Sequence, residues 1–167
     1  MKKTVILLLF FLALLTSCHK KGITLFAGDY SYKMSGSVEL APAEGSSLEP
    51  IQLDITNEIG NLQISKLDKE DGSVMVVMNA LNGGLSTTTA YCDGKEIVFD
   101  EFEHHLKLTN IASGINTNSV VSVEAEGAMY DDNTIILNVS FSGEQTYLGN
   151  TYTIQGDDIT MVAYRNN

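Results

Sequence analysis

The sequence is poor in basic residues. Its 167 residues include 10 lysines and arginines against 21 aspartates and glutamates, and Arg165 is the only arginine. Two of the lysines, Lys2 and Lys3, lie in a segment that we expect to be removed, which leaves eight basic residues and a charge of about −13. Phosphate binding needs clustered Lys and Arg, so this composition excludes a nucleic-acid partner. The acidity fits a solubilising surface, with a cationic or metal partner as the alternative.

Signatures of common enzymes are also missing. No serine sits between glycines at the spacing of a hydrolase nucleophile elbow, and zinc-protease and phosphate-loop motifs are absent. A Ser-His-Asp arrangement built on His104 or His105 stays open, but no local motif supports it. We therefore predict a protein that is not an enzyme and that uses no cofactor.

Only one long hydrophobic run is present. Residues Val5 to Leu15 form an unbroken apolar stretch of eleven residues behind Lys2 and Lys3. A transmembrane helix needs about 20 apolar residues, whereas a basic start followed by a shorter apolar run is typical of a secretory signal peptide. We predict that residues 1–17 are such a signal.

The end of this segment reads Leu15, Thr16, Ser17, Cys18. It resembles the lipobox of bacterial lipoproteins, in which a branched apolar residue and two small residues precede a cysteine. The resemblance implies that a diacylglycerol is attached to Cys18 and that the signal is cut just before it. Several acyl chains then hold the protein to a membrane far more firmly than one chain would, with residues 18–27 as a lipid-anchored tether.

The residues after Cys18 bear on the location. The second mature residue is His19 rather than the Asp that marks inner-membrane retention in well-studied envelopes, and this favours the outer membrane. Lys20 and Lys21 form a basic pair, and the acidic tether that some lipoproteins use to reach the cell surface is missing. We expect an outer-membrane lipoprotein of the cell envelope, with the periplasmic face favoured over the cell surface.

Cysteine is scarce, with two residues in the chain. Once Cys18 is lipidated, no disulfide can form within the chain and Cys92 is left as an unpaired thiol. Cys92 ends a strand-like run and has no base nearby in the sequence, so we predict that it is buried rather than reactive.

Helical periodicity is rare after Cys18, whereas period-two alternation between turn residues recurs along the chain. The clearest hairpin joins residues 121–125 to residues 135–141 through a turn at residues 131–133. Gly60 with Asn61, and Gly156 with Asp157, are also interpreted as turns between strands. Residues 103–118 fit either a strand or a short helix. Together these patterns predict an all-β fold without parallel crossovers.

A long antiparallel meander has two exposed edges, and closure into a barrel removes both. We predict a single domain over residues 28–167, an up-and-down barrel of about 8–10 strands. A β-sandwich is the alternative, but Greek-key sandwiches need long crossing connections and only two loops are long enough.

The start of the predicted domain, Gly28, Asp29, Tyr30, is a glycine followed by an aromatic first strand. In an acidic, lipidated chain of this size that continues as a meander, it resembles the calycin-like or lipocalin-like lipoproteins of Gram-negative envelopes. The resemblance covers residues 28–164 in pattern and implies a lipocalin-like barrel. The chain has no tryptophan, a residue that is typical of the first strand of true lipocalins.

A barrel of about eight strands is near the size at which the interior either fills with side chains or holds one small ligand. Aromatic and methionine side chains suit an adaptable apolar cavity, and the candidates to line it are Tyr30, Tyr32, Met34, Met78, Tyr91 and Met161. The leading hypothesis is a non-enzymatic envelope lipoprotein that binds a small apolar or amphipathic ligand. The alternative is a filled barrel that interacts with an envelope protein through its loops at residues 41–50 and 111–119.

The densest polar cluster lies at residues 100–105. On a strand, Glu101, Glu103 and His105 share one face at spacings of about 6–7 Å, so two of them could reach one ion but three would be strained. On a helix, Asp100 would pair with His104 one turn away. We expect a solvated strand end here and no metal site.

Overall fold

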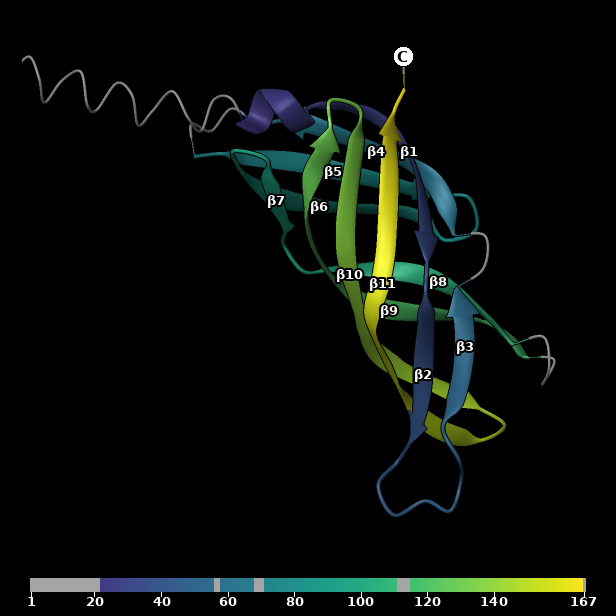
Figure 1. Cartoon of the computed structure of the whole chain (residues 1–167). Coiled ribbons are helices and arrows are strands. Elements are labelled where there is room, and N and C mark those ends of the chain that lie inside the picture. The colour runs from purple at the N-terminus through teal and green to yellow at the C-terminus, as the bar shows by residue number, and fades with distance from the viewer. Residues whose placement is uncertain (1–21, 56–57, 68–70, 111–114, 167) are drawn as a thin grey trace, which may run out of the picture.

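The computed structural model describes residues 22–55, 58–67, 71–110 and 115–166. A short helix over residues 22–26 precedes eleven antiparallel strands (Figure 1). In chain order the strands are β1 (Gly28–Ser35), β2 (Ser37–Pro42), β3 (Ile51–Ile55), β4 (Ile59–Lys66), β5 (Ser73–Ala80), β6 (Gly84–Asp93), β7 (Glu96–Phe99), β8 (Phe102–Asn110), β9 (Ile115–Asp131), β10 (Thr134–Tyr147) and β11 (Asn150–Arg165).

The eleven strands make eight consecutive passes of the chain. β1 and β2 both pair with β11, and β7 and β8 both pair with β9, so each of these pairs is one interrupted strand. In the same way β4 pairs with β1 while β3 pairs with β2. Each pass hydrogen-bonds to the next, and the pairing of β1 with β11 closes the ring. The predicted all-β meander and its closure into a barrel are confirmed.

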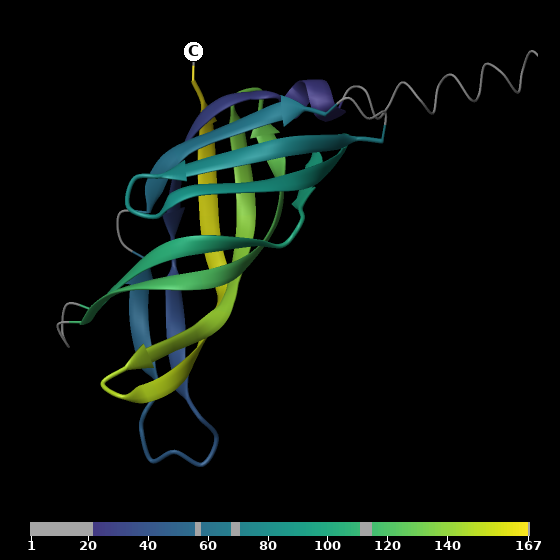
Figure 2. The same cartoon turned by 180° about the vertical axis from the view of Figure 1, so that it is seen from behind.

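The barrel closes differently at its two ends. Around the half that carries the helix, the ring runs β1-β4-β5-β6-β7-β9-β10-β11. In the other half β5 and β6 are absent from the ring, and β3 pairs directly with β8 through Asp54 with Thr109 and Ile55 with Leu108. The three long strands β9, β10 and β11 extend through both halves (Figures 1 and 2).

Side chains alternate between a buried apolar interior and a mostly polar exterior. On β10, Ile135, Leu137, Val139 and Phe141 are at most 2% exposed, as the predicted hairpin pattern requires, and Asn138 between them is exposed. Buried side chains from all eight passes form one hydrophobic core. The interior of the barrel is thus where the hydrophobic driving force for folding acts.

Two predicted turns are wrong, because their glycines serve close packing inside strands. β4 runs through Gly60, where an added Cβ would lie 2.3 Å from the Asn79 carbonyl oxygen and 2.8 Å from the Tyr32 ring. β11 runs through Gly156, where a Cβ would lie 2.7 Å from Val38 Cγ1. Only glycine leaves room for these contacts. Both glycines therefore lie within strands, where neighbouring passes approach closely, and neither forms a turn.

The segment left open at residues 103–118 is strand wherever it is described. β8 ends at Asn110 and β9 begins at Ile115, while residues 111–114 lie outside the described residues. Burial alternates strictly along β8, with Phe102, His104, Leu106 and Leu108 inside the barrel. The alternation follows the pleat of a strand that is buried on one face.

The helix over residues 22–26 caps one end of the barrel. Phe26 is fully buried and Ile23 is 9% exposed, so residues predicted to belong to the tether are part of the folded domain. The Tyr30 hydroxyl donates to the Phe26 carbonyl at 2.7 Å, and the Arg165 guanidinium donates to the carbonyls of Ala27, at 2.8 Å, and of Leu25. Arg165 also stacks over the Tyr30 ring, 4.9 Å from its centroid. The last strand thereby holds the helix in place.

Within the part of the chain that the structure describes, no helix has the length and apolar character needed to cross a membrane.

Candidate functional site

Five of the six predicted cavity residues lie inside the barrel. Tyr30, Tyr32, Met34, Met78 and Met161 are each at most 3% exposed and belong to the hydrophobic core. At that exposure protein atoms cover these side chains on all sides, so they pack the interior and present no free face to a ligand.

Tyr91 lies on the outer wall instead, with 43% of its surface exposed, and its assignment to a cavity is wrong. Its neighbour Cys92 is fully buried, which confirms the prediction for the thiol. Successive side chains on a strand point to opposite faces, so Tyr91 and Cys92 cannot both face inward. Burial raises the pKa of Cys92 to about 12.

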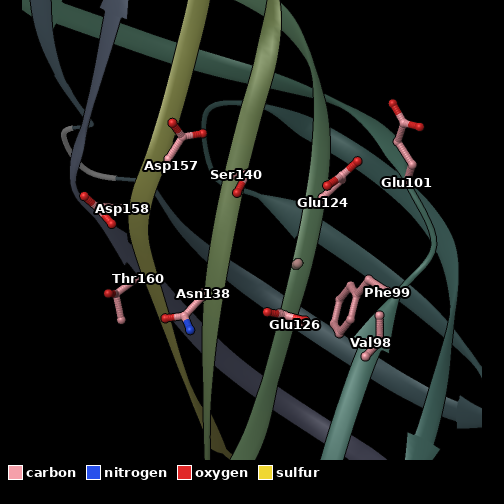
Figure 3. Close-up of a pocket in the computed structure, with 11 residues that line it drawn as sticks. Val98, Phe99, Glu101, Glu124, Glu126, Asn138, Ser140, Asp157, Asp158 and Thr160 are labelled. Carbon is pink, nitrogen blue, oxygen red and sulfur yellow. The ribbon is translucent and has the colours of Figure 1, made fainter.

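A groove on the outer wall of the barrel has a volume of about 700 Å³. We call it the acidic groove. Figure 3 shows how four passes contribute to it, with Asp157 and Asp158 on β11 at one side and Glu101 beyond β7 at the other. Its lining comprises Val98, Phe99, Glu101, Glu124, Ala125, Glu126, Asn138, Ser140, Asp157, Asp158 and Thr160.

A β-bulge places two of the carboxylates. Between β10 and β11 the register shifts from Val139 opposite Ile159 to Phe141 opposite Gly156, so Ser140 faces both Asp157 and Asp158. A regular strand would turn one of two neighbouring residues inward. Because of the extra residue, both aspartates are exposed on the outer wall, as bulges commonly re-aim side chains beside functional sites.

The acidic groove is strongly negative. Five carboxylates line it, and its lining contains no lysine or arginine. The Ser122 hydroxyl donates to Glu101. Register sets Glu124 opposite Ser140 and Glu126 opposite Asn138, so each acidic side chain on β9 has a polar, uncharged neighbour on β10. This arrangement suits a ligand that brings positive charge and hydrogen-bond donors.

A second, more apolar groove of about 610 Å³, which we call the apolar groove, continues the acidic groove toward the helix end of the barrel and shares Val98, Glu126 and Asn138 with it. Its other lining residues are Glu96, Ile97, Gly127, Ala128, Met129, Tyr130 and Ile136. Along β9 the outward residues change from Glu124 and Glu126 to Ala128 and then Tyr130. On β10 the residues that line the two grooves change in the same way, from Ser140 and Asn138 to Ile136. The outer wall therefore grades from acidic to apolar over a few residues.

A second polar cluster lies inside the barrel. His104 Nε2 is 3.0 Å from Glu58 Oε1, and His104 Nδ1 is 3.1 Å from the Ser86 hydroxyl, with the histidine and carboxylate side chains fully buried. Ser86 also donates to the Glu103 carbonyl at 3.0 Å. Burial and then the Glu58 carboxylate raise the pKa of Tyr32 beside them.

This cluster has the order serine, histidine, carboxylate that hydrolases use. Ser86, however, is 7% exposed and its hydroxyl already donates to a carbonyl. The cluster connects the start of β4 with β6 and β8 through hydrogen bonds inside the barrel.

The acidic and histidine residues at positions 100–105 do not act as one group. His104 points inward, whereas Glu101, Glu103 and His105 are exposed on the outer face as expected for a strand. Within the described residues, no three His, Cys, Asp or Glu side chains are placed to hold a metal ion. Of the cluster, Glu101 alone takes part in the acidic groove.

Meander order, ring closure and a filled interior define the chain as an up-and-down antiparallel β-barrel protein. No protein-family model and no curated protein matches the sequence. Among solved structures, a redesigned β-barrel is similar at a TM-score of 0.44 and 7% identity, over 88% of this chain and 96% of that one. The attachment invasion locus protein Ail of Yersinia pestis, solved with the heparin analogue sucrose octasulfate, is similar at 0.37 and 10% identity, over 84% and 100%.

Proposed function

We propose that the protein is a non-enzymatic, lipocalin-like envelope lipoprotein whose filled barrel binds a cationic, amphipathic ligand on its outer wall. The observation that carries this proposal is the continuous surface formed by the acidic groove and the apolar groove beside it. A basic, partly apolar peptide segment of another envelope protein has the matching chemistry.

Charge and shape support this ligand class together. Carboxylates around a concave surface concentrate a cationic partner and speed its association. The apolar groove supplies area whose burial contributes about 25 cal/mol per Å². The described residues predicted to hold a purely apolar small molecule in the interior, Tyr30, Tyr32, Met34, Met78 and Met161, are packed in the core.

The membrane anchor belongs to the same proposal and is supported by the sequence of residues 1–18. Cys18→Ala should abolish labelling by radioactive fatty acid and move the protein out of the membrane fraction. A wild-type protein that takes up no fatty acid would refute the anchor and leave the groove proposal in place.

Binding can be tested with a synthetic peptide of alternating lysine and leucine, and with a glutamate and leucine peptide as its control. The lysine peptide should bind, and Glu124→Gln combined with Glu126→Gln should weaken binding at least tenfold, or about 1.4 kcal/mol. The matched control, Glu44→Gln with Glu49→Gln, removes the same charge from the β2–β3 loop, away from the acidic groove. Equal effects of the two double variants on calorimetric affinity would mean that only net charge matters.

A further inference from the structure

The two ends of the barrel are not equivalent with respect to the lipid anchor. The helix over residues 22–26 lies at the end where the β6–β7 and β9–β10 turns and the end of β11 also lie (Figures 1 and 2). An added Cβ on Gly22 would lie 3.3 Å from the Gly94 amide nitrogen in the β6–β7 turn. Together with the Arg165 hydrogen bonds to Leu25 and Ala27, this packing makes residues 22–27 part of the folded domain.

The chain between anchor and domain is short. Four residue steps separate Cys18 from Gly22, and a fully extended chain spans at most about 3.6 Å per residue, or roughly 14 Å in total. A lipidated Cys18 therefore keeps the helix end within roughly 14 Å of the bilayer surface. This distance is less than two Debye lengths of about 8 Å each at physiological ionic strength. By contrast β11, with 16 residues, extends on the order of 50 Å away from that end.

Exposed aromatic side chains lie at the same end. Tyr130 is 73% exposed and Tyr164 is 57% exposed. They are close in register, because Thr134 pairs with both Tyr164 and Asp131. Tyrosine is enriched at membrane interfaces, where its ring sits at the level of the headgroups and its hydroxyl faces water.

The charge of the protein is distributed unevenly along the barrel. We define the helix end as residues 22–31, 64–67, 71–74, 91–97, 129–136 and 162–166. It carries three basic and six acidic residues, or −3. The other described residues carry two basic and 13 acidic residues, or −11. An anionic bilayer surface repels the second group strongly and the first one little.

We propose that the helix end of the barrel rests on the bilayer, with Tyr130 and Tyr164 among the lipid headgroups and the acidic groove held farther out. This arrangement rests on the proposed lipidation of Cys18. It directs the apolar groove toward the membrane and the acidic groove toward the aqueous side. An amphipathic cation would therefore bind with its apolar part nearest the lipid.

The absence of tryptophan from the chain makes a direct test possible. Tyr130→Trp, Tyr164→Trp and Leu48→Trp each introduce one fluorescent reporter, the last in the loop between β2 and β3 at the opposite end. The full-length lipidated variants are reconstituted into vesicles of phosphatidylethanolamine and phosphatidylglycerol, with and without a lipid that carries a nitroxide on its headgroup. Urea unfolding confirms that each variant is folded.

Tyr130→Trp and Tyr164→Trp should lose most of their emission to the nitroxide lipid, and Leu48→Trp should keep its emission. Equal quenching of all three reporters, or stronger quenching of Leu48→Trp, would overturn the arrangement. The mass of the N-terminal peptide and flotation with vesicles are measured on the same samples. An unlipidated, non-floating protein would refute the anchor and this arrangement together, whereas a floating, lipidated protein with equal quenching would refute the arrangement alone.

Discussion

His104 is the centre of the buried polar cluster inside the barrel. It is fully buried, and its two ring nitrogens contact the Glu58 carboxylate and the Ser86 hydroxyl. Ionisable groups survive burial only when they are paired and hydrogen-bonded. Glu58 Oε1 contacts His104 Nε2 at 3.0 Å, and both side chains are fully buried, so His104 is a main partner of this carboxylate.

We predict that His104→Leu destabilises the protein by about 3–5 kcal/mol, because it leaves the buried carboxylate unpaired. The double variant His104→Leu with Glu58→Met removes both partners and should be more stable than His104→Leu alone. Urea unfolding of chains that begin at His19 measures both. Additive losses in the double variant would show that the two side chains are not coupled.

Cys92 gives a prediction about alkaline pH. Its pKa is raised from 9.0 to about 12 by burial, so the folded protein keeps the neutral thiol while the unfolded chain ionises near pH 9. The contribution of the buried neutral Cys92 thiol to the free energy of unfolding is complete below pH 9. It is lost as the pH rises from about 9 toward 12, by up to about 1.4 kcal/mol per pH unit.

The free energy of unfolding should accordingly fall between about pH 8 and pH 10, and it should fall less in Cys92→Ala. Urea midpoints at the two pH values test this. Parallel losses in the wild type and the variant would assign the alkaline instability to other groups, such as Tyr30, whose pKa burial also raises.

At the scale of strands, alternation identified most of the inward faces correctly. It failed on β6, where threonines dominate and the inward positions are Ser86, Ala90 and Cys92. Ser86 faces inward because it bonds to β8, a contact between strands that are distant in sequence. A strand whose core face carries polar residues shows no hydrophobic alternation. The sequence therefore does not reveal that Tyr91 points outward.

Gly60 and Gly156 resemble turn residues in the local sequence for a related reason. At Gly60 and Gly156 the residue is required by a neighbouring pass of the chain, and the neighbour cannot be read from the local sequence. The acidic groove cannot be predicted from the local sequence. Its carboxylates come from passes separated by up to 57 positions in the chain, from Glu101 to Asp158. The bulge that exposes Asp157 and Asp158 leaves no local sequence signal beyond an acidic pair.

The two faces of β4 provide the test of alternation itself. Leu62 is fully buried between β1 and β5, whereas Asn61 beside it is exposed and pairs with Ser31 and Asn79. Leu62→Asp should destabilise the protein by several kcal/mol, because it buries a charge without a partner, while Asn61→Asp should cost about 0.5 kcal/mol or less. Equal urea midpoints would mean that the faces are not distinct.

At the scale of the whole molecule, the outer wall around the two grooves changes character along the barrel axis. The outer wall is apolar near the helix end, at Tyr130 and Ile136, and acidic farther along, at Glu126 and Asp158. Like charges that converge on one surface oppose folding through mutual repulsion. Since the described lining of the acidic groove contains no lysine or arginine to offset its carboxylates, their convergence is more easily explained by binding than by stability.

That explanation predicts a gain in stability when the acidic groove is neutralised. Glu126→Gln with Asp158→Asn should raise the free energy of unfolding by about 0.5–1 kcal/mol at low salt, and the gain should shrink in high salt, where the repulsion is screened in the wild type too. The control pair Glu44→Gln with Glu49→Gln, in the exposed β2–β3 loop, should change stability less. Thermal unfolding at low and high sodium chloride measures each difference. A loss of stability in the groove variant would show that these carboxylates support the fold, and it would remove the reason to regard the acidic groove as a surface kept for a cationic ligand.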